Sequence, residues 1–382
     1  LSSSLTHGLE NGVARFPDEI ETIERLAAEN FRGLAAALER HRIDAAYETR
    51  PEVALARAPH QTSWFAEAAA LARRFGHDVD VLDRDGAQAI VRSPIVIGAF
   101  RHNDGNALVD PAKLAWGLRD TAIRLGVEVH ESSPVRGLED TNEGVRLLTD
   151  HGVLLAARAI LATNGFPPLV SAIRRYVVPV YDHVLMTEPL SEVRRDAIGW
   201  RGREGLADAA NRFHYFRLSA DDRILWGGYD ATYHWGGGVE PRFEQDDRVH
   251  RRLARNFFEF FPQLEGIAFT HRWGGVIDTC SRFSVMFGTA LGGRLAYAVG
   301  YTGLGVGASR FGAHAALDLV DGLDTERTRL SLVRRRPVPF PPEPFRWPGI
   351  RLTIAAMDRE DRTGRRGPWL RLLDRLGLGF QS

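Results

Sequence analysis

The feature that most constrains this chain is a short apolar strand that runs through four closely spaced glycines into a helix. The strand covers residues 296–299, the glycines lie between Gly300 and Gly307, and the helix reaches about Val320. Glycines let a ligand lie directly on the backbone, Thr302 adds a hydroxyl, and the first N–H groups of a helix have no partner within it. Because a helix N-terminus favours negative charge, the element predicts a site for an electron-rich ligand. A tight strand-to-helix turn without a ligand is the alternative, and the spacing alone does not decide between the two.

Length and composition narrow the classes of protein that remain. With 382 residues, the chain is long enough for two domains. Its 49 basic and 49 acidic residues give a formal net charge of zero, so no global attraction to nucleic acid or to an anionic membrane is expected. The single cysteine, Cys280, excludes an intramolecular disulfide and argues against a cysteine-based metal site, and we expect no bound metal. The sequence shows neither an apolar run long enough to span a bilayer nor a signal peptide, so we expect a soluble, cytoplasmic protein.

The first half of the chain reads as helices alternating with short strands. The clearest helix opens at Asp110 and Pro111, with Leu114, Leu118, Ala122 and Leu125 as its buried stripe. Other apolar patterns predict helices over residues 17–40 and 62–75. Strands are expected over residues 46–57, 79–82, 95–100, 127–130, 134–138 and 159–163, with a hairpin formed by residues 144–150 and 153–157. A βα unit with a meander attached is typical of a nucleotide-binding sheet.

The second half changes character after residue 168. Residues 176–187 and 213–229 alternate apolar and polar side chains like antiparallel strands, and a helix is expected over 245–261. Beyond Leu323 come three consecutive arginines, a proline-rich passage from Pro337 to Pro348, and a helix over residues 369–376. Three arginines in a row are typical of a solvated face, so we expect no nucleic-acid partner. The prolines are expected to hold an extended arm against the body of the chain or against a partner subunit in a homo-oligomer.

Three glycine-bearing turns each follow a strand. They are Val135 with Gly137, Thr163 with Asn164 and Gly165, and the segment from Gly300 to Gly307. If the three turns lie along one edge of a sheet, they form a trough for an elongated ligand, and a dinucleotide fits that description better than a mononucleotide.

These turns also carry a resemblance to a known family. Residues 159–165 and the run Gly300, Tyr301, Thr302, Gly303, Leu304, Gly305 and Val306 are similar to the second and third flavin-contacting segments of the FAD-dependent D-amino-acid oxidase superfamily. Asp110 with Pro111, and Trp273 with the two glycines after it, match the same pattern. The resemblance covers nearly the whole chain to about Asp321. It implies an α/β fold with a Rossmann-like FAD-binding domain (1–45, 104–170 and 289–325), an antiparallel-sheet α+β substrate domain (46–103 and 171–288), and a C-terminal arm with a helix (326–382).

The largest departure from the family pattern lies at the start of the chain. Family members begin with a strand, a Gly-x-Gly-x-x-Gly turn and a helix that hold the pyrophosphate, and this sequence contains none of these. Residues 1–8 resemble the segment that comes directly after that unit in the family, so the FAD-binding domain is expected to be incomplete at its N-terminus. Either the sequence is a fragment or the protein is impaired in binding FAD.

A second departure bears on the substrate. Amino-acid oxidases of the family hold the substrate carboxylate with arginine, but the two corresponding positions are Ile277 and Gly303 here. This favours an amine or a γ-glutamyl amine over a simple α-amino acid. Arg282 could still reach a carboxylate or could equally be a surface arginine. Sarcosine oxidases of the superfamily attach flavin to a cysteine, but Cys280 lies too close to the following strand for that role, so we expect non-covalent FAD.

The resemblance implies an FAD-dependent oxidoreductase that acts on a C–N bond. Hydride leaves the substrate for flavin N5, and the imine then hydrolyses to an aldehyde or keto acid and ammonia or an amine. The only lysine, Lys113, lies on the helix after Asp110, so the final electron acceptor stays open between O2 and another acceptor. We expect His7, Tyr215 and His214 near the ring. A non-catalytic binding or assembly protein of the same fold is the main alternative, and an NAD-dependent dehydrogenase is weaker because the glycine segment lies late in the chain.

Overall fold

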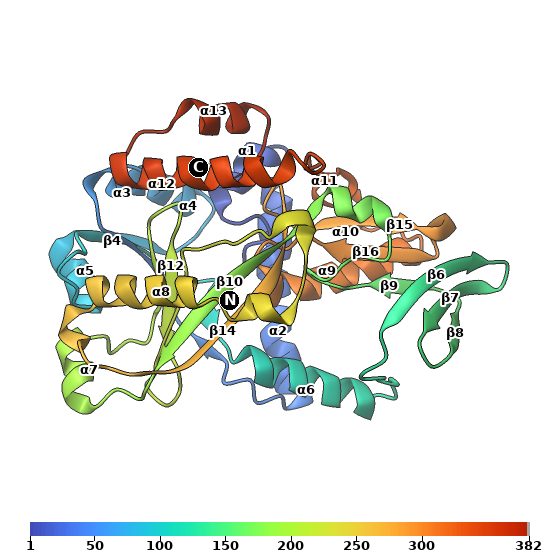
Figure 1. Cartoon of the computed structure of the whole chain (residues 1–382), viewed down its shortest axis with the longest axis horizontal. Coiled ribbons are helices and arrows are strands. Elements are labelled where there is room, and N and C mark those ends of the chain that lie inside the picture. Colours follow the sequence, from blue (N-terminus) through green and yellow to red (C-terminus); the bar gives the residue numbers. More distant parts are fainter. Residues whose placement is uncertain (380–382) are drawn as a thin grey trace.

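The computed structural model describes residues 1–379. One side of the molecule contains a large mixed sheet, and the other contains two small three-stranded sheets with their helices (Figure 1). A further short pair joins β1 (Glu48–Thr49) to β5 (Ala107–Leu108). All eight strands of the large sheet lie within residues 52–102 and 177–280.

The large sheet has eight strands in the order β14, β10, β13, β12, β11, β2, β4 and β3. Neighbours are antiparallel except β2 and β11, which run parallel. Strand β14 forms one edge and pairs with β10 along almost its whole length, from Cys280 opposite Val177 to Phe269 opposite Thr187. The bounds are β2 (Glu52–Ala56), β3 (Val79–Leu82), β4 (Gly98–His102), β10 (Val177–Thr187), β11 (Gly205–Asp208), β12 (His214–Leu218), β13 (Ile224–Gly228) and β14 (Phe269–Cys280).

One face of the large sheet, here called the helix side, carries the largest apolar core. Helix α8 (Asp247–Phe260) covers it, with its first turn capped by the Asp246 carboxylate. Trp226 and Phe216 from the sheet pack there against Phe257 and Phe260. Because side chains alternate along a strand, the residues between these face the other way. Helices α5 (Arg84–Ile90) and α7 (Glu192–Ile198) extend the same core.

The opposite face is here called the open side. Near β2 and β4 it is covered by helix α4 (Phe65–Arg74), which packs Phe65 against Phe100. Toward β12, β10 and β14 the open side carries Tyr215, Asp182 and Ile277, which are half-buried. The sequence pattern predicts one helix over 62–75; instead α3 (Pro59–Thr62) and α4 are separate, because Ser63 and Trp64 form a turn between them.

The small sheets carry the predicted glycine element. Strand β16 pairs in parallel with β9 and antiparallel with β15, and helix α9 (Gly305–Val320) packs on β16 and on α2 (Ile20–His41). The core between them contains Phe311, Ile23 and Phe287. The strand bounds are β9 (Ala159–Leu161), β15 (Met286–Ala290) and β16 (Leu295–Val299), and the meander is β6 (Val135–Thr141), β7 (Gly144–Thr149) and β8 (Val153–Ala156).

Two predictions about the region after Asp110 are wrong. Helix α6 (Pro111–Arg124) begins as expected, with the Asp110 carboxylate accepting from Ala112 and Lys113, but the predicted stripe is buried only at Leu114. Leu118 and Leu125 are 50% and 69% exposed, because this part of the helix packs through a different face, where Thr121 is buried and Arg124 donates to the His41 carbonyl of α2. Residues 127–130 are not a strand, because no described strand pairs with them and an isolated strand leaves its backbone groups unbonded. The hairpin β7–β8 and strand β9 are confirmed.

The C-terminal arm packs against the body of the same chain. After α9 come two short helices, then an extended segment whose Val338 carbonyl accepts from Ser281 Oγ and whose Phe340 N–H donates to Arg175. Helix α12 (Arg346–Thr363), which the sequence pattern does not predict, crosses over α3 and α4 in Figure 1 and is followed by α13 (Pro368–Arg375), which is predicted. The short helices are α10 (Glu326–Arg329) and α11 (Ser331–Arg334), and α1 (Leu9–Arg15) lies near the start of the chain.

Candidate functional site

The glycine element is a tight turn with a strained backbone. Gly300 and Gly303 have φ of 79° and 92°, and Thr302 between them has φ of 54°, a region that only glycine adopts without strain. Helix α9 then begins at Gly305, and its N-cap residue, Leu304, has no side chain that can accept from the first turn. The first N–H groups of α9 therefore lack a side-chain cap, and a Cβ added at Gly303 would meet no atom within 4 Å.

Asp278 at the end of β14 fixes this turn. Its carboxylate accepts from the N–H groups of Gly300 (2.6 Å) and Tyr301 (3.1 Å), and its carbonyl accepts from Thr302 (2.9 Å). Thr302 Oγ1 in turn accepts from the N–H of Cys280 at 3.1 Å. Burial raises the pKa of Asp278 to about 6, against the opposing effect of these donors. Asp278 is a site residue that no sequence pattern indicates.

The second predicted turn reaches the same strand. Gly165 lies so close to β14 that a Cβ there would stand 2.6 Å from Val276 Cγ2 and 3.4 Å from the Asp278 nitrogen. Beside it, the Thr163 hydroxyl is buried without a hydrogen-bond partner in the described part of the chain. Two segments about 140 residues apart in sequence thus meet at Asp278, and a buried hydroxyl without a partner in the described chain lies beside them.

His7 lies against the glycine element. Its Nε2 is 2.5 Å from the Thr302 carbonyl, and its ring meets Phe283 edge-on at 5.9 Å between centroids. Burial lowers the pKa of His7 to about 4, so the imidazole is neutral at physiological pH and Nε2 carries the hydrogen that Thr302 accepts. The main chain at Ser2 also packs on Gly307, where a Cβ would lie 2.2 Å from the Ser2 oxygen.

Tyr215 and His214 lie on opposite faces of the large sheet. Tyr215 is on the open side, and its hydroxyl donates to Asp182 on β10 at 2.7 Å. It crosses β13 at Gly227, where a Cβ would lie 2.7 Å from the Tyr215 Oη. His214 faces the helix side, stacked on Trp226 and bonded to Asp208 at 2.8 Å. The expectation that both residues approach one ring is therefore wrong for His214, because adjacent residues of a strand point to opposite faces.

The N-terminal segment connects the open side to the glycine element. Leu1 accepts at its carbonyl from the N–H of Ala107, and its amino group lies close enough to Glu52 and Arg217 of the open side for their charges to act on it. Six residues further along, His7 contacts Thr302. The open side and the glycine turn thus border the same segment of chain.

Arg282 is held away from any ligand. Its guanidinium donates to the carbonyls of Ser284, Arg335, Val285 and Leu332, and only 5% of the residue is exposed. All three nitrogens are committed to main-chain oxygens. Arg282 is therefore neither a carboxylate-binding residue nor a surface arginine; it fastens the start of the C-terminal arm.

Val135 is the predicted cofactor residue that the structure does not bring to this site. It pairs with Thr149 in the β6–β7–β8 meander, and no hydrogen bond between described residues joins it to either glycine turn. Cys280 lies beneath Gly300, fully buried, with its Sγ 3.0 Å from the Ser284 carbonyl. Lys113 is on the exposed surface of α6, where its Nζ is 3.6 Å from Asp44.

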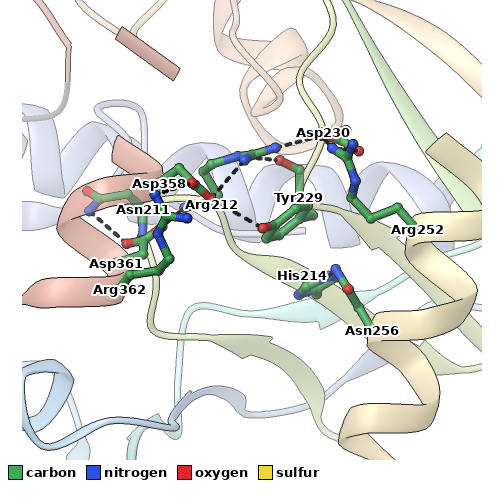
Figure 2. A network of polar contacts seen from close by, with 10 residues as sticks. All are labelled: Asn211, Arg212, His214, Tyr229, Asp230, Arg252, Asn256, Asp358, Asp361 and Arg362. Carbon is green, nitrogen blue, oxygen red and sulfur yellow. Dashed lines mark hydrogen bonds and ion pairs between the residues drawn. The ribbon is translucent and has the colours of Figure 1, made fainter. Parts of the chain in front are cut away.

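A separate polar cluster lies on the helix side of the sheet (Figure 2). Arg212 stands over the Tyr229 ring at 4.1 Å and pairs with Asp230 and with Asp358 of α12. Asp361 accepts from the N–H of Arg212, so α12 is fastened to the loop before β12. A cavity of about 220 Å³ lies among these groups. The cluster explains why α12 docks on its own chain.

Known proteins share this architecture. Residues 2–319 match the family described as DAO, FAD dependent oxidoreductase. The chain is 28% identical over 274 residues to a probable oxidoreductase OrdL of Haemophilus influenzae, covering 70% of this chain and 59% of that protein. It is 31% identical over 260 residues to the gamma-glutamylputrescine oxidoreductase of Escherichia coli K12, covering 66% of this chain and 57% of that protein. The chain thus spans less than two thirds of the length of these relatives.

A solved structure shows the same fold. Glycine oxidase from Geobacillus kaustophilus superposes with a TM-score of 0.69 at 19% sequence identity, covering 82% of this chain and 83% of that chain. The mixed α/β architecture predicted from the sequence is therefore confirmed. None of the helices in residues 1–379 is long and apolar enough to cross a membrane.

Proposed function

The chain belongs to the family of FAD-dependent oxidoreductases, and from this premise we propose that the protein oxidises a C–N bond of an amine or of a substrate derived from an amino acid. The observation that carries the proposal is the convergence at Asp278 of two glycine turns, one with an unpaired Thr163 hydroxyl and one that leads into an uncapped helix. A named relative, gamma-glutamylputrescine oxidoreductase, supports a substrate of this kind. The name oxidoreductase in these relatives does not favour a non-catalytic role.

The residues at the two turns fit FAD. Thr163, Asn164 and Gly165 would present a hydroxyl and a close main chain, and the segment from Gly300 to Val306 would present uncapped N–H groups to an electron-rich ring or chain. Val135 stays a prediction from the family resemblance. We propose that FAD binds non-covalently, because the thiol of Cys280 is fully buried and engaged with the Ser284 carbonyl.

Bound FAD would supply the acceptor for the hydride that leaves the substrate carbon, after which the imine product hydrolyses to a carbonyl compound and ammonia or an amine. The chain itself must orient the substrate C–H bond, exclude water and keep the amine nitrogen neutral. The neutral imidazole of His7 contributes a polar group that stays uncharged, since its pKa is lowered to about 4. Tyr215 contributes a second polar group on the open side of the sheet.

The substrate proposal follows from the absence of an arginine that could bind a substrate carboxylate. Ile277 is half-buried on the open side and Gly303 has no side chain, so neither position offers an arginine to a carboxylate. Arg282, the remaining candidate, is committed to four carbonyls. We therefore propose amines, including γ-glutamyl amines, in preference to simple α-amino acids.

The test uses the full-length protein. A preparation that carries flavin should absorb at about 450 nm, and a panel of polyamines, γ-glutamyl amines, N-methyl amino acids and D-amino acids should be screened for anaerobic bleaching of that band. Bleaching by amines supports the proposal. A colourless protein that cannot be reconstituted with FAD contradicts it, and bleaching by D-amino acids alone overturns the argument from Ile277 and Gly303. Adding O2 or a quinone to the bleached protein and following the return of the flavin absorbance then identifies the electron acceptor.

A further inference from the structure

The carboxylate of Asp182 has no basic partner in the described part of this arginine-rich chain. Of the four most buried aspartates, three are paired with arginine, for example Asp208 with Arg57 at 3.1 Å and Asp230 with Arg252 at 2.7 Å, and the fourth, Asp278, accepts from main-chain N–H groups. Among residues 1–379, no arginine, lysine or histidine forms an ion pair with Asp182. A carboxylate withdrawn from water without a counter-charge is costly, so a positive group that is not part of the described chain would be favoured beside it.

Hydrogen bonds orient the Asp182 carboxylate but do not occupy all of its acceptor positions. Tyr215 Oη donates to Oδ2 at 2.7 Å and the N–H of His183 donates to Oδ1 at 2.9 Å. A carboxylate has about four acceptor positions. Two donors therefore leave about two positions for further N–H groups.

The space next to Asp182 is open because its neighbour on β14 has no side chain. Gly275 stands directly opposite Asp182 in the β10–β14 register, it is exposed, and a Cβ there would meet no atom within 4 Å. Along the same face, Trp273 is 39% exposed and Ile277 is half-buried. An alkyl group lying over Gly275 would have an aromatic ring on one side and an aliphatic side chain on the other.

The charges around this position are few. Burial raises the pKa of Asp182, which is the largest influence on it, while the Tyr215 hydroxyl opposes the rise. The His183 ring points to the other face, where its Nε2 lies 2.9 Å from the Phe243 carbonyl, and its charge acts from there to lower the pKa of Asp182, against the larger effect of burial. Strand β14 contributes Gly275 and no charge opposite Asp182. Arg217 lies two residues beyond Tyr215 on the same face, about 7 Å further along the strand.

We propose that Asp182, oriented by Tyr215, receives the ammonium group of an alkyl amine whose carbon chain lies over Gly275. The inference rests on the proposed function and names the substrate class: a cationic amine without an α-carboxylate. In the binding step one proton passes from the R–NH3⁺ group to the Asp182 carboxylate, which gives a neutral amine and a neutral carboxylic acid. Asp182 thus performs the deprotonation that C–N oxidation requires, and Tyr215 is a positioning residue.

The experiment measures binding of an amine that cannot react, so that its result does not depend on turnover. tert-Butylamine has no hydrogen on the carbon that bears nitrogen, and its neutral and anionic counterparts are tert-butanol and pivalate. Each is titrated calorimetrically into the full-length, FAD-loaded protein. We expect tert-butylamine to bind more tightly than either counterpart and Asp182→Asn to weaken it by about 10- to 100-fold, as for loss of a charge-assisted hydrogen bond.

Three further variants keep the test decisive. Tyr215→Phe should weaken amine binding by about 3- to 10-fold and shift the pH dependence of binding, which a merely structural role would not do. Gly275→Val should abolish binding while the protein folds normally, because its side chain enters open space. Asp80→Asn on β3 of the same sheet, where the carboxylate pairs with Arg101, is the matched control and should bind the amine like the parent.

Equal affinity of the parent and the Asp182→Asn protein for tert-butylamine, or tighter binding of pivalate than of the amine, would overturn the inference. Unchanged binding in a folded Gly275→Val protein would do the same. The proposed function fails separately: if tert-butylamine binding depends on Asp182 but no oxidisable amine bleaches the flavin, the amine site stands and the C–N oxidation does not. If amines bleach the flavin equally in the parent and the Asp182→Asn protein, only the inference fails.

Discussion

Replacing Asp278 by asparagine should change how stability depends on pH. Burial raises the pKa of Asp278 to about 6 in the folded protein, whereas an aspartate in an unfolded chain has a pKa of about 3.9. The folded state therefore binds the proton more tightly. The stabilisation is fully present below about pH 4 and is lost as pH rises through about 6, and two pKa units correspond to about 3 kcal/mol.

Asparagine has no such pH dependence, but it loses an acceptor. The Asp278 carboxylate accepts from Gly300 and Tyr301 through different oxygens, and an amide can accept through only one. That loss costs about 1–3 kcal/mol at every pH. The stability of the parent relative to Asp278→Asn should thus fall by about 3 kcal/mol between about pH 4 and about pH 7.

The assay is urea unfolding followed by tryptophan fluorescence, with both proteins in the same state of cofactor loading, at half-unit steps of pH. Taking the difference cancels every other titrating group that the two proteins share. Asp80→Asn is the control. The Asp80 carboxylate accepts from Asn103 and Arg101, which lower its pKa. The difference in free energy of unfolding between the parent and the Asp80→Asn protein should therefore not change with pH above about pH 4.5. If the difference in free energy of unfolding between the parent and the Asp278→Asn protein does not change with pH across the same range, burial does not raise the pKa of Asp278 as described.

Three other substitutions test the surroundings of the site. Thr163→Val removes a buried hydroxyl that has no partner in the described chain, so it should leave the free energy of unfolding unchanged or slightly raised while FAD binds about 10-fold more weakly in a fluorescence titration; unchanged FAD affinity would contradict the assignment of the turn. Gly227→Ala places a Cβ 2.7 Å from the Tyr215 Oη, so it should cost about 1–3 kcal/mol in urea unfolding and raise the KM for amines, whereas Gly275→Ala should cost little. Arg282→Met leaves the carbonyls of Val285 and Leu332 without this donor, so we expect a loss of at least about 2 kcal/mol and faster proteolysis of residues 337–345; an arm that stays resistant would show that Arg282 does not fasten it.

Local sequence signals were sufficient for the elements whose ends are marked by a capping residue or by glycines. The glycines after residue 299 and the cap at Asp110 are features of adjacent residues, and both elements form where they are predicted. The exposed half of α6 and the absent strand over residues 127–130 depend instead on what packs against them. Periodicity indicates which face of a helix is apolar, but it does not show that another element covers that face.

The candidate site was predictable only in part for the same reason. The two turns at Thr163 and Gly300 could be found as strand ends with glycine, but Asp278 joins them through main-chain N–H groups far away in sequence, which no spacing reveals. Period-two alternation alone separates His214 from Tyr215 onto opposite faces, and applying it to β12 would have corrected that prediction. Asp182 belongs to no sequence motif. It is identified as a candidate site residue only from the structure, by its register with Gly275 and its hydrogen bond from Tyr215.

The proposed selectivity for amines rests as much on where arginine is absent as on where a carboxylate is present. On the helix side of the sheet, Arg57 and Arg252 neutralise Asp208 and Asp230, so those carboxylates offer nothing to a cation in solution. On the open side, Asp182 forms no ion pair within the described part of the chain. An arginine at position 277, two residues beyond Gly275 and on the same face, would both neutralise Asp182 and attract a carboxylate. Because isoleucine stands there, strand β14 leaves space at Gly275 and adds no positive charge beside Asp182, and both features are what the proposed amine site requires.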